Sequence, residues 1–204
     1  MISLVDYGLG NIQAFANIYN KLGVACSIAR NIEDLSLATR LILPGVGAFD
    51  WAMQRLESSG MRPALDDLVL NQHMPVLGIC VGMQMMANSS EEGHLPGLGW
   101  ISGQVTRFDE SLLSSKTSLP HMGWNDIAPK EHHLFANISD PRFYFLHSYY
   151  FQPESAEQIL AEAKYGQRFA AAVCKNHVIG VQFHPEKSHH WGIQLLRNFA
   201  DFQA

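Results

Sequence analysis

The first ninety residues alternate between short, mostly apolar runs and longer segments with apolar residues at helical spacing. The apolar runs cover residues 2–5, 24–29, 41–43 and 75–80. Between the first two runs, apolar residues recur at helical spacing from Ile12 to Leu22, and Gly23 ends this pattern. Further helices are predicted near 33–37, up to Ser58, and over 61–70. Strands without polar alternation that are separated by helices are typical of a parallel sheet covered on both faces.

The pattern changes after Ser89, where polar loops separate strands of a different kind. Residues 103–108 alternate between apolar and polar side chains, which predicts a half-solvated strand. Further strands are predicted at 142–151, 170–174 and 178–183, with a turn at 175–177, a final helix over 191–202 and a mobile, serine-rich excursion at 109–117. The chain is therefore predicted to form one α/β domain over residues 1–204. Its mostly parallel central sheet is flanked by helices, with additional antiparallel strands in the C-terminal half.

Composition and charge narrow the classes of function. The 204 residues are 47% apolar and carry a formal net charge of −5, with a pI near 6.0. Without a basic stretch to neutralise phosphates, no nucleic acid partner is expected. No apolar run approaches the ~20 residues of a membrane helix, and the N-terminus lacks the basic region of a signal peptide. Cys26, Cys80 and Cys174 are odd in number and far apart, which favours a reducing compartment. We therefore expect a cytoplasmic protein without a membrane partner.

Cys80 closes the strand at 75–80 and lies between Gly78 and Gly82. Good helix formers follow from Met83 to Ala87. Cys80 is thus predicted to occupy a tight strand-to-helix turn, as serine does in the Gly-x-Ser-x-Gly nucleophile elbow. Small neighbours give a substrate access, and the start of a helix favours the thiolate. The alternative is a cysteine that only packs in the core, where free cysteines are common.

Two glycine-containing loops are predicted at the same edge of the sheet as Cys80. Residues 6–11 follow the first strand, but Gln13 stands where a dinucleotide-binding Gly-x-Gly-x-x-Gly motif needs its third glycine, which disfavours that interpretation. Residues 44–50 follow the third strand, and Gly45 and Gly47 allow backbone N–H groups to turn toward an anion. A plain strand–helix connection would need the same glycines. Sites in parallel sheets form beyond the carboxyl ends of the strands, where both loops lie.

His184 and Glu186 supply a candidate base and its orienting group. They follow the strand at 178–183, and Pro185 between them is expected to hold the backbone extended. Residues two apart in an extended chain point the same way. The Glu186 carboxylate would then bind one imidazole nitrogen and leave the other to take the thiol proton, which completes a triad for covalent catalysis. The alternatives are a histidine without a role and a surface carboxylate paired with Lys187.

Histidine pairs at 132–133 and 189–190 raise the question of a metal site. Adjacent residues of an extended chain point to opposite sides, and no cysteine or carboxylate stands at ligand spacing. We therefore expect no metal and no other cofactor.

Together these residues resemble a known family. Gly78-Ile79-Cys80-Val81-Gly82-Met83-Gln84 with His184-Pro185-Glu186 is similar to the elbow and triad of the class I glutamine amidotransferases, which have a flavodoxin-like three-layer fold. Further segments, in unbroken order from about residue 2 to 202, resemble the glutaminase subunits of imidazole glycerol phosphate synthases. They lie at 6–11, 44–49, 90–92, 120–125, 147–150 and 182–188. Pro-His-Met-Gly-Trp-Asn at 120–125 and His-Ser-Tyr-Tyr at 147–150 are the most specific of these.

The resemblance implies hydrolysis of glutamine to glutamate and ammonia through a thioester on Cys80, with His184 as base and acid and Glu186 as its orienting group. The implied oxyanion donors are the backbone N–H groups of Val46, Gly47 and Val81. The implied substrate-binding residues are Gln84, Glu92, His147, Ser148 and Tyr149.

The resemblance also implies a heterodimer with a (β/α)8-barrel cyclase that receives the ammonia in histidine biosynthesis, with contacts at Asn11, Tyr144 and Lys187. The aromatic residues between Phe143 and Phe151 fit such a docking face, or equally a core strand that exposes a few rings. Departures from the family pattern at 109–118 and 189–191 leave room for a paralogue that serves a sugar-amidating partner in surface-polysaccharide synthesis. Further alternatives are a stand-alone cysteine peptidase or γ-glutamyl hydrolase, and a non-catalytic scaffold subunit, which would not need an intact triad.

Overall fold

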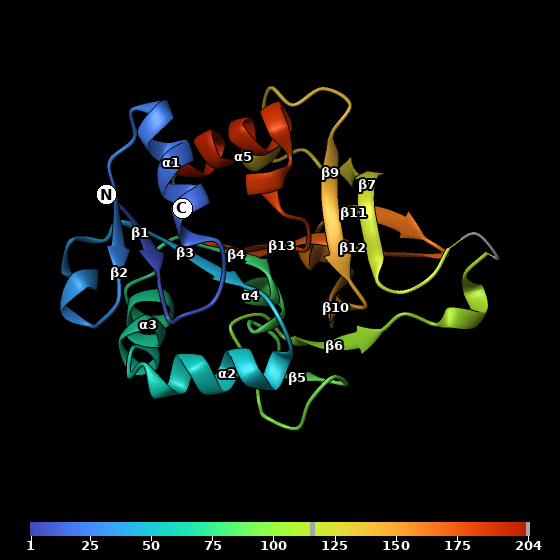
Figure 1. Ribbon diagram of the computed structural model, residues 1–204, viewed down its shortest axis with the longest axis horizontal. Helices are drawn as coiled ribbons and strands as arrows, with labels where there is room; N and C mark the ends of the chain where they lie inside the picture. The colour runs from blue at the N-terminus through green and yellow to red at the C-terminus, as the bar shows by residue number, and fades with distance from the viewer. Residues whose placement is uncertain (115–116, 203–204) are drawn as a thin grey trace.

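The computed structural model describes residues 1–114 and 117–202, and it places one large sheet at the centre of the chain (Figure 1). In spatial order its strands are β2 (Cys26–Ala29), β1 (Ile2–Val5), β3 (Arg40–Gly45), β4 (Val76–Cys80), β13 (Val178–Val181), β12 (Gln167–Lys175), β11 (Ile159–Tyr165) and β8 (Ala128–Pro129). Strands β2 through β13 pair in parallel, and β12, β11 and β8 continue the sheet antiparallel. The predicted α/β fold, with a parallel centre and antiparallel additions from the C-terminal half, is confirmed.

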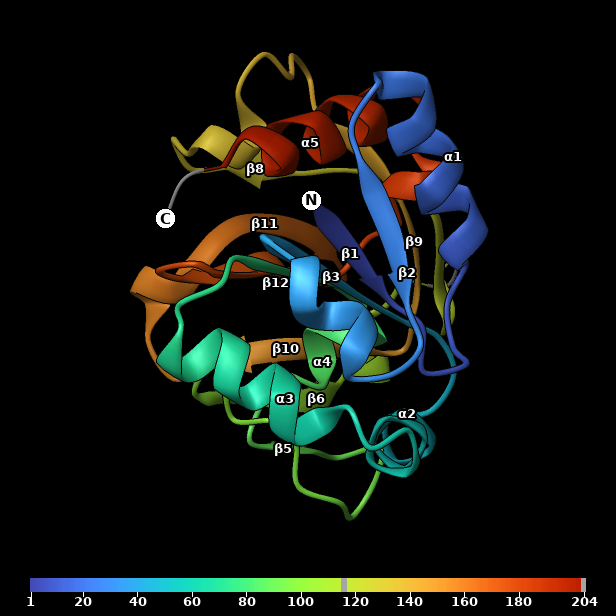
Figure 2. The ribbon, with the colours of Figure 1, turned by 90° about the vertical axis from the view of Figure 1, so that its left-hand side faces the viewer.

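Helices cover both faces of this sheet and make three layers (Figure 2). On one face lie α1 (Ile12–Leu22) and α5 (His189–Asp201), joined by the Tyr19 hydroxyl, which donates to the Leu196 carbonyl oxygen at 3.3 Å. On the other lie α2 (Phe49–Ser58), α3 (Arg62–Asp66) and α4 (Val81–Gln84). Strands β1 and β4 are buried along their whole lengths because the two helical layers exclude water from both sides.

Two smaller sheets extend the molecule on one side. One contains β10 (Tyr149–Pro153), β6 (Gly103–Arg107) and β5 (Ser89–Ser90), and the other is a ribbon of β7 (His121–Asp126) and β9 (Arg142–His147). The single strand predicted over 142–151 is therefore wrong, because β9 and β10 belong to different sheets. Nδ1 of His147 lies 2.7 Å from the carbonyl oxygen of Tyr149, and this local contact spans the break between the two strands.

Other boundaries differ from the sequence prediction in smaller ways. Strands β5, β7, β8 and β11 were not predicted. The helix expected over 61–70 is α3 followed by a π-helical turn at Asp67–Asn71, and the helix after Cys80 is the single turn of α4. Short 3-10 helices occur at Glu33–Leu37, Glu110–Leu112, His133–Phe135, Ala156–Gln158 and Pro185–Lys187. Of the segment predicted to be mobile, residues 115–116 lie outside the described part of the chain. Within the described part, no helix is long and apolar enough to cross a membrane.

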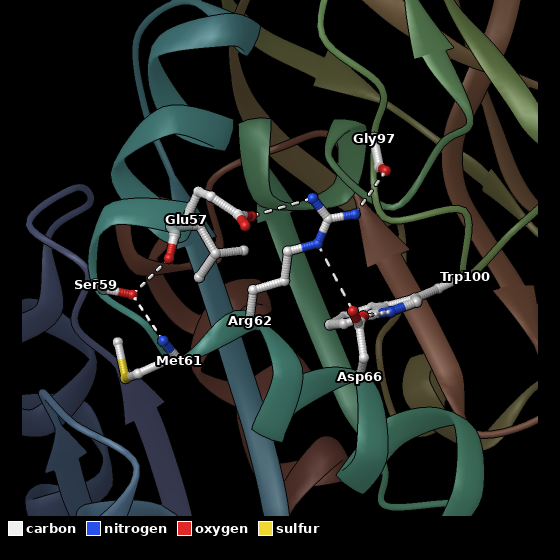
Figure 3. Close-up of polar contacts among 8 residues, drawn as sticks. Glu57, Ser59, Met61, Arg62, Asp66, Gly97 and Trp100 are labelled. Carbon is white, nitrogen blue, oxygen red and sulfur yellow. Dashed lines mark hydrogen bonds and ion pairs between the residues drawn. The ribbon is translucent and has the colours of Figure 1, made fainter.

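Arg62 on α3 connects three segments that pack below the sheet (Figure 3). Its guanidinium lies 3.2 Å from Glu57 and 3.6 Å from Asp66, and it donates to the Gly97 carbonyl oxygen at 3.4 Å. Asp66 also accepts a 2.7 Å hydrogen bond from the indole nitrogen of Trp100, which is only 2% exposed. These contacts fix the loop at 93–102 onto α3 and so support the strand β5 that precedes it.

Replacing Asp66 with alanine is expected to destabilise the protein by about 1–3 kcal/mol, because the buried indole N–H of Trp100 would lose its acceptor. The measurement is the free energy of unfolding in urea. In a Trp100→Phe background, which has no indole donor, the same substitution should cost less. Equal costs in the two backgrounds would mean that this hydrogen bond does not contribute to stability.

Candidate active site

Cys80 is the last residue of β4 and stands directly before α4. Its backbone has φ 55° and ψ −113°, a conformation that residues other than glycine rarely adopt. Such strain persists only where the surrounding structure enforces it, which is common at functional sites. Here the enforcement comes from close backbone packing, since a β-carbon on Gly82 would collide with the carbonyl oxygen of Leu43. The strand-to-helix turn predicted for Cys80 is present, although its helix is too short to contribute a large dipole.

The His184 imidazole lies beside the Cys80 sulfur, and its Nδ1 lies 2.9 Å from Oε1 of Glu186. The predicted contact between His184 and Glu186 therefore exists, but the reason given for it was wrong. Pro185–Lys187 form a 3-10 turn instead of an extended chain. The two side chains meet because this turn curls the backbone, and Pro185 fits its first position, where no N–H donor is needed.

Strand β9 holds this turn through its backbone. The carbonyl oxygen of Tyr144 accepts the N–H of His184 at 2.9 Å, and the N–H of Tyr144 donates to the hydroxyl of Ser188 at 3.0 Å. The same hydroxyl donates to the carbonyl oxygen of His184 at 2.6 Å. Because Ser188 is fully buried, these bonds are shielded from water and fix the position of the imidazole.

The charge of the triad is set by burial and by mutual contacts. His184 and Glu186 expose only 4% and 3% of their side chains. Burial disfavours a charged imidazole, but the hydrogen bonds to Cys80 and Glu186 and their negative charges outweigh it and raise the pKa of His184 well above its ordinary value. Oε2 of Glu186 is buried without a hydrogen-bond partner among the described residues, so this carboxylate depends on the imidazolium for compensation. Positive charge beside a cysteine sulfur favours the nucleophilic thiolate.

Two buried glutamines connect the nucleophile to the far side of the site. Nε2 of Gln182 lies 3.8 Å from the Cys80 sulfur, and Oε1 of Gln182 accepts a hydrogen bond from Nε2 of Gln84 at 3.0 Å. Nε2 of Gln84 also donates to the carbonyl oxygen of Tyr149 at 3.0 Å. The sequence analysis named Gln84 but missed Gln182. An amide within an apolar, buried segment just before the candidate base was the available signal.

Two buried histidines continue this network from Tyr149. Nδ1 of His147 contacts the carbonyl oxygen of Tyr149, which can only accept, so Nδ1 carries the proton. Nε2 of His147 must then accept from Nδ1 of His121, 3.1 Å away, and Nε2 of His121 accepts from the amide of Asn125 at 3.3 Å. This assignment requires both rings to be neutral. Burial lowers the pKa of His147 to about 3 and that of His121 to about 4, which agrees.

These elements surround a pocket of about 500 Å³ at the carboxyl edge of the parallel strands. The predicted site residues that line it are Val46, Gly47, Cys80, Val81, Gln84, Glu92, His147, Ser148, Tyr149, His184 and Lys187. Arg107, Pro120 and Leu146 also line it, although the sequence analysis did not name them. Glu186 does not line the pocket and acts through His184, which separates it from the cavity. Residues from the loop between β3 and α2, and from segments as far along the chain as the 3-10 turn at Pro185–Lys187, therefore meet at this pocket.

Some candidate substrate ligands are already engaged within the protein. Oε2 of Glu92 accepts the backbone N–H of Phe49, the first residue of α2, at 2.9 Å. Both ring nitrogens of His147 are used in the histidine network. Glu92 therefore retains one carboxylate oxygen for a ligand, whereas His147 is placed to orient Tyr149.

The candidate interface residues lie at two places. Nζ of Lys187 stands over the ring of Tyr144, 5.8 Å from its centre, which is a cation–π contact. Asn11 lies at the start of α1, where its side chain accepts the N–H of Ala14 at 3.3 Å and caps the helix.

The two histidine pairs make local structural contacts. Nδ1 of His132 accepts the N–H of Leu134 at 3.1 Å, and the ring of His189 stacks on Trp124 with an interplanar angle of 6°. Over residues 1–114 and 117–202, no group of three or more His, Cys, Asp or Glu side chains is arranged to hold a metal ion.

A cysteine at a strained turn, with a buried histidine–glutamate pair at the edge of a parallel sheet, is the arrangement that covalent catalysis by a thiol requires. The sequence matches the family model Glutamine amidotransferase class-I over residues 3–201, and the chain belongs to that family. Its relatives include proteins named imidazole glycerol phosphate synthase subunit HisH. The one from Bdellovibrio bacteriovorus is 55% identical over 98% of this chain and 100% of its own length. The one from Leptospira interrogans is 48% identical over 98% and 99%.

Solved structures show the same fold at low sequence identity. A crystal structure of a glutamine amidotransferase superposes with a TM-score of 0.74 at 18% identity, covering 98% of this chain and 97% of that one. The structure of PurLQS from Thermotoga maritima gives 0.72 at 15% identity, with the same coverages. These likenesses concern the fold alone.

Three of the buried histidines, His121, His147 and His184, predict an optimum of stability near pH 6.5. His121 and His147 have folded-state pKa values below the ordinary 6.5, so the unfolded chain binds more protons as the pH falls toward about 4, and stability is lost. His184 has a raised pKa, so its contribution is complete below pH 6.5 and is lost as the pH rises through that raised value. Urea unfolding across this pH range measures both limbs.

The matched control is His121→Gln, whose amide can still donate to His147. This variant removes one titrating group and should flatten the acid limb while leaving the alkaline limb unchanged. An acid limb as steep as that of the wild type would show that His121 does not remain neutral in the folded protein.

Proposed function

We propose that this chain is the glutaminase subunit of an imidazole glycerol phosphate synthase, acting as a single cytoplasmic domain in histidine biosynthesis. The observation that carries the proposal is the contact of Cys80, His184 and Glu186 at one pocket. It occurs in a chain that is 55% identical, over 98% of its length, to a protein named as such a subunit.

In the proposed reaction, the Cys80 sulfur attacks the side-chain amide carbon of glutamine. The carbon–nitrogen bond then breaks, the proton held by His184 passes to the departing nitrogen, and ammonia leaves a glutamyl thioester. His184 next takes a proton from water, whose oxygen attacks the thioester carbon. The carbon–sulfur bond breaks, the thiolate of Cys80 and the imidazolium of His184 are restored, and the product carboxylic acid gives its proton to solvent to leave as glutamate. Glu186 stabilises the imidazolium throughout, because its buried carboxylate faces Nδ1.

The remaining pocket residues are proposed to bind the oxyanion and the substrate. The oxyanion donors are the backbone N–H groups of Val46, Gly47 and Val81, all of which line the cavity. Losing one such donor typically raises the barrier by about 2.7–4 kcal/mol. Glutamine would be held by Gln84, Glu92, Ser148 and Tyr149, with His147 orienting the carbonyl group of Tyr149.

The exposed apolar side chains on the outer face of the β7–β9 ribbon favour the binding of a protein partner there. Met122 pairs with Leu146 and Trp124 with Tyr144 across the ribbon. Met122 is 66% exposed, and Trp124 and Leu146 are 37% exposed, although on the opposite face of the ribbon Phe143, Phe145 and His147 are buried against the protein. An exposed apolar patch on the outer side of a ribbon whose inner side is already packed is typical of a protein–protein interaction site. We propose that a (β/α)8-barrel cyclase docks here, with Lys187 and Asn11 as further contacts.

This position also explains the transfer of ammonia. Leu146 lines the pocket, and its carbonyl oxygen lies 4.0 Å from the Cys80 sulfur. A partner seated on the ribbon would therefore border the cavity in which the carbon–nitrogen bond breaks. Ammonia could pass to it without entering bulk solvent.

Replacing Cys80 with alanine is expected to reduce glutamine hydrolysis at least about 10³-fold, because no other group near His184 can form the thioester. Ammonia and glutamate release, assayed with and without the barrel partner, are the measurements. The unfolding midpoint should stay close to that of the wild type, since the change removes one sulfur atom next to an open pocket. Full residual hydrolysis would refute the triad.

Placing a charge on the ribbon by Met122→Glu is expected to weaken co-purification with a (β/α)8-barrel cyclase at least about tenfold, because the carboxylate would be buried against apolar groups. Leu37→Glu is the matched control, since Leu37 is 70% exposed and lies in the 3-10 helix at Glu33–Leu37, outside the ribbon. If both variants, with intact circular dichroism, retain the partner equally, the ribbon is not the docking face.

A further inference from the structure

The pocket is lined by a positively charged side chain, Arg107, that belongs neither to the triad nor to the proposed partner contacts. Arg107 ends β6 and lines the cavity, in which the other charged residues are Glu92, Lys187 and His184. His184 belongs to the triad, and the ammonium group of Lys187 lies over Tyr144 on the ribbon side. Arg107 thus presents a second, separate positive charge to the cavity from the three-stranded sheet.

The pairing of β6 with β10 positions the Arg107 side chain. Arg107 stands directly opposite Tyr149 in this antiparallel pair, so both side chains leave the same face of the sheet. The guanidinium lies over the Tyr149 ring at 5.8 Å, and Nη1 donates to the Tyr149 hydroxyl at 3.4 Å. Nη2 donates to Glu110 at 2.7 Å. Gln84 and His147 both bind the Tyr149 carbonyl oxygen. Tyr149, which Arg107 contacts, is therefore held in place at the site.

The same sheet also carries the negative charge of the pocket. Oε2 of Glu91 accepts the backbone N–H of Arg107 at 2.7 Å, and β5, which immediately precedes Glu91, pairs with β6. Glu92 follows directly, with its N–H bonded to the hydroxyl of Ser90 at 3.1 Å. The small sheet and the residues that directly follow β5 therefore supply both a guanidinium and a carboxylate to the lining of the pocket. A zwitterion is the chemical class of ligand that matches both.

We propose that Arg107 binds the α-carboxylate of free glutamine and so selects the free amino acid over a glutamine residue within a peptide. This inference rests on the proposed glutaminase function. A guanidinium offers N–H donors in a fixed fork that fits a carboxylate. The Nη groups retain N–H donors beyond those directed at Tyr149 and Glu110, because the guanidinium carries five in all. A peptide-bound glutamine has a neutral amide in place of the carboxylate and could not form this second charge-assisted contact with the guanidinium.

The test compares glutamine with 4-aminobutanamide, which keeps the side-chain amide and the ammonium group but lacks the carboxylate. The readout is kcat/KM for ammonia release, which does not require saturation. Arg107→Gln should lower kcat/KM for glutamine at least about tenfold, mainly through KM, and change kcat/KM for 4-aminobutanamide by less than about twofold. Arg107→Lys should recover part of the loss for glutamine, because it restores the charge without the fork.

Two matched variants separate this role from general electrostatics. Arg168→Gln removes an exposed arginine from β12 that does not line the pocket, and Lys187→Gln removes the other pocket cation. Neither should alter the ratio of kcat/KM between the two substrates. If Arg107→Gln lowers both substrates equally, or neither, or if Lys187→Gln changes the ratio instead, the inference is overturned. A wild-type protein that releases no ammonia from glutamine, even with the barrel partner, would instead refute the proposed function.

Discussion

The close contact between the backbones of β3 and α4 is the constraint on which the site depends. Gly82 packs against the Leu43 carbonyl, and a β-carbon on Gly45 would in turn collide with the backbone nitrogen of Gly82. With side chains at these positions, α4 could not approach the end of β3. Cys80 could then not be held at φ 55°, and the loop carrying Val46 and Gly47 would lie farther from the sulfur. Two missing methyl groups thus bring the nucleophile and the candidate oxyanion donors to one edge of the sheet.

The sequence predicted the parallel half of the fold well because each element there carries its own signal. Strand β1 and helix α1 were predicted with their observed bounds, since a strand buried along its whole length is mostly apolar and Gly23 adopts the left-handed conformation that ends α1. The antiparallel half was harder. Strand β11 contains Glu162 and Lys164 and has an irregular register, so it lacks a clear alternation, and β8 is only two residues long. The division of 142–151 into two strands depends on contacts of His147 that local pattern cannot show.

In the site, too, the residues with a local sequence signal were predicted, and those that depend on distant contacts were not. Cys80, His184 and Glu186 could be named from spacing, yet the turn that joins the last two is a 3-10 turn and not the extended chain assumed. Gln182, His121 and Arg107 escaped notice because their importance lies in contacts across the fold. His121 is 26 residues from His147, and Gln182 is 102 residues from Cys80. Only packing of distant segments reveals that buried amides and neutral imidazoles form one hydrogen-bonded network around the pocket.

The bonds between β9 and the turn that carries His184 use only backbone atoms of Tyr144. The Tyr144 side chain, in contrast, points to the outer surface and takes no part in holding the base. Evolution can therefore exchange the outward residues of this ribbon, one at a time, without displacing the imidazole. Strand β9 therefore has two separate roles. Its outward side chains form the surface proposed to recognise a partner, and its backbone holds the turn that carries His184. Such a separation lets one hydrolytic centre be adapted to different acceptor enzymes while its chemistry stays the same.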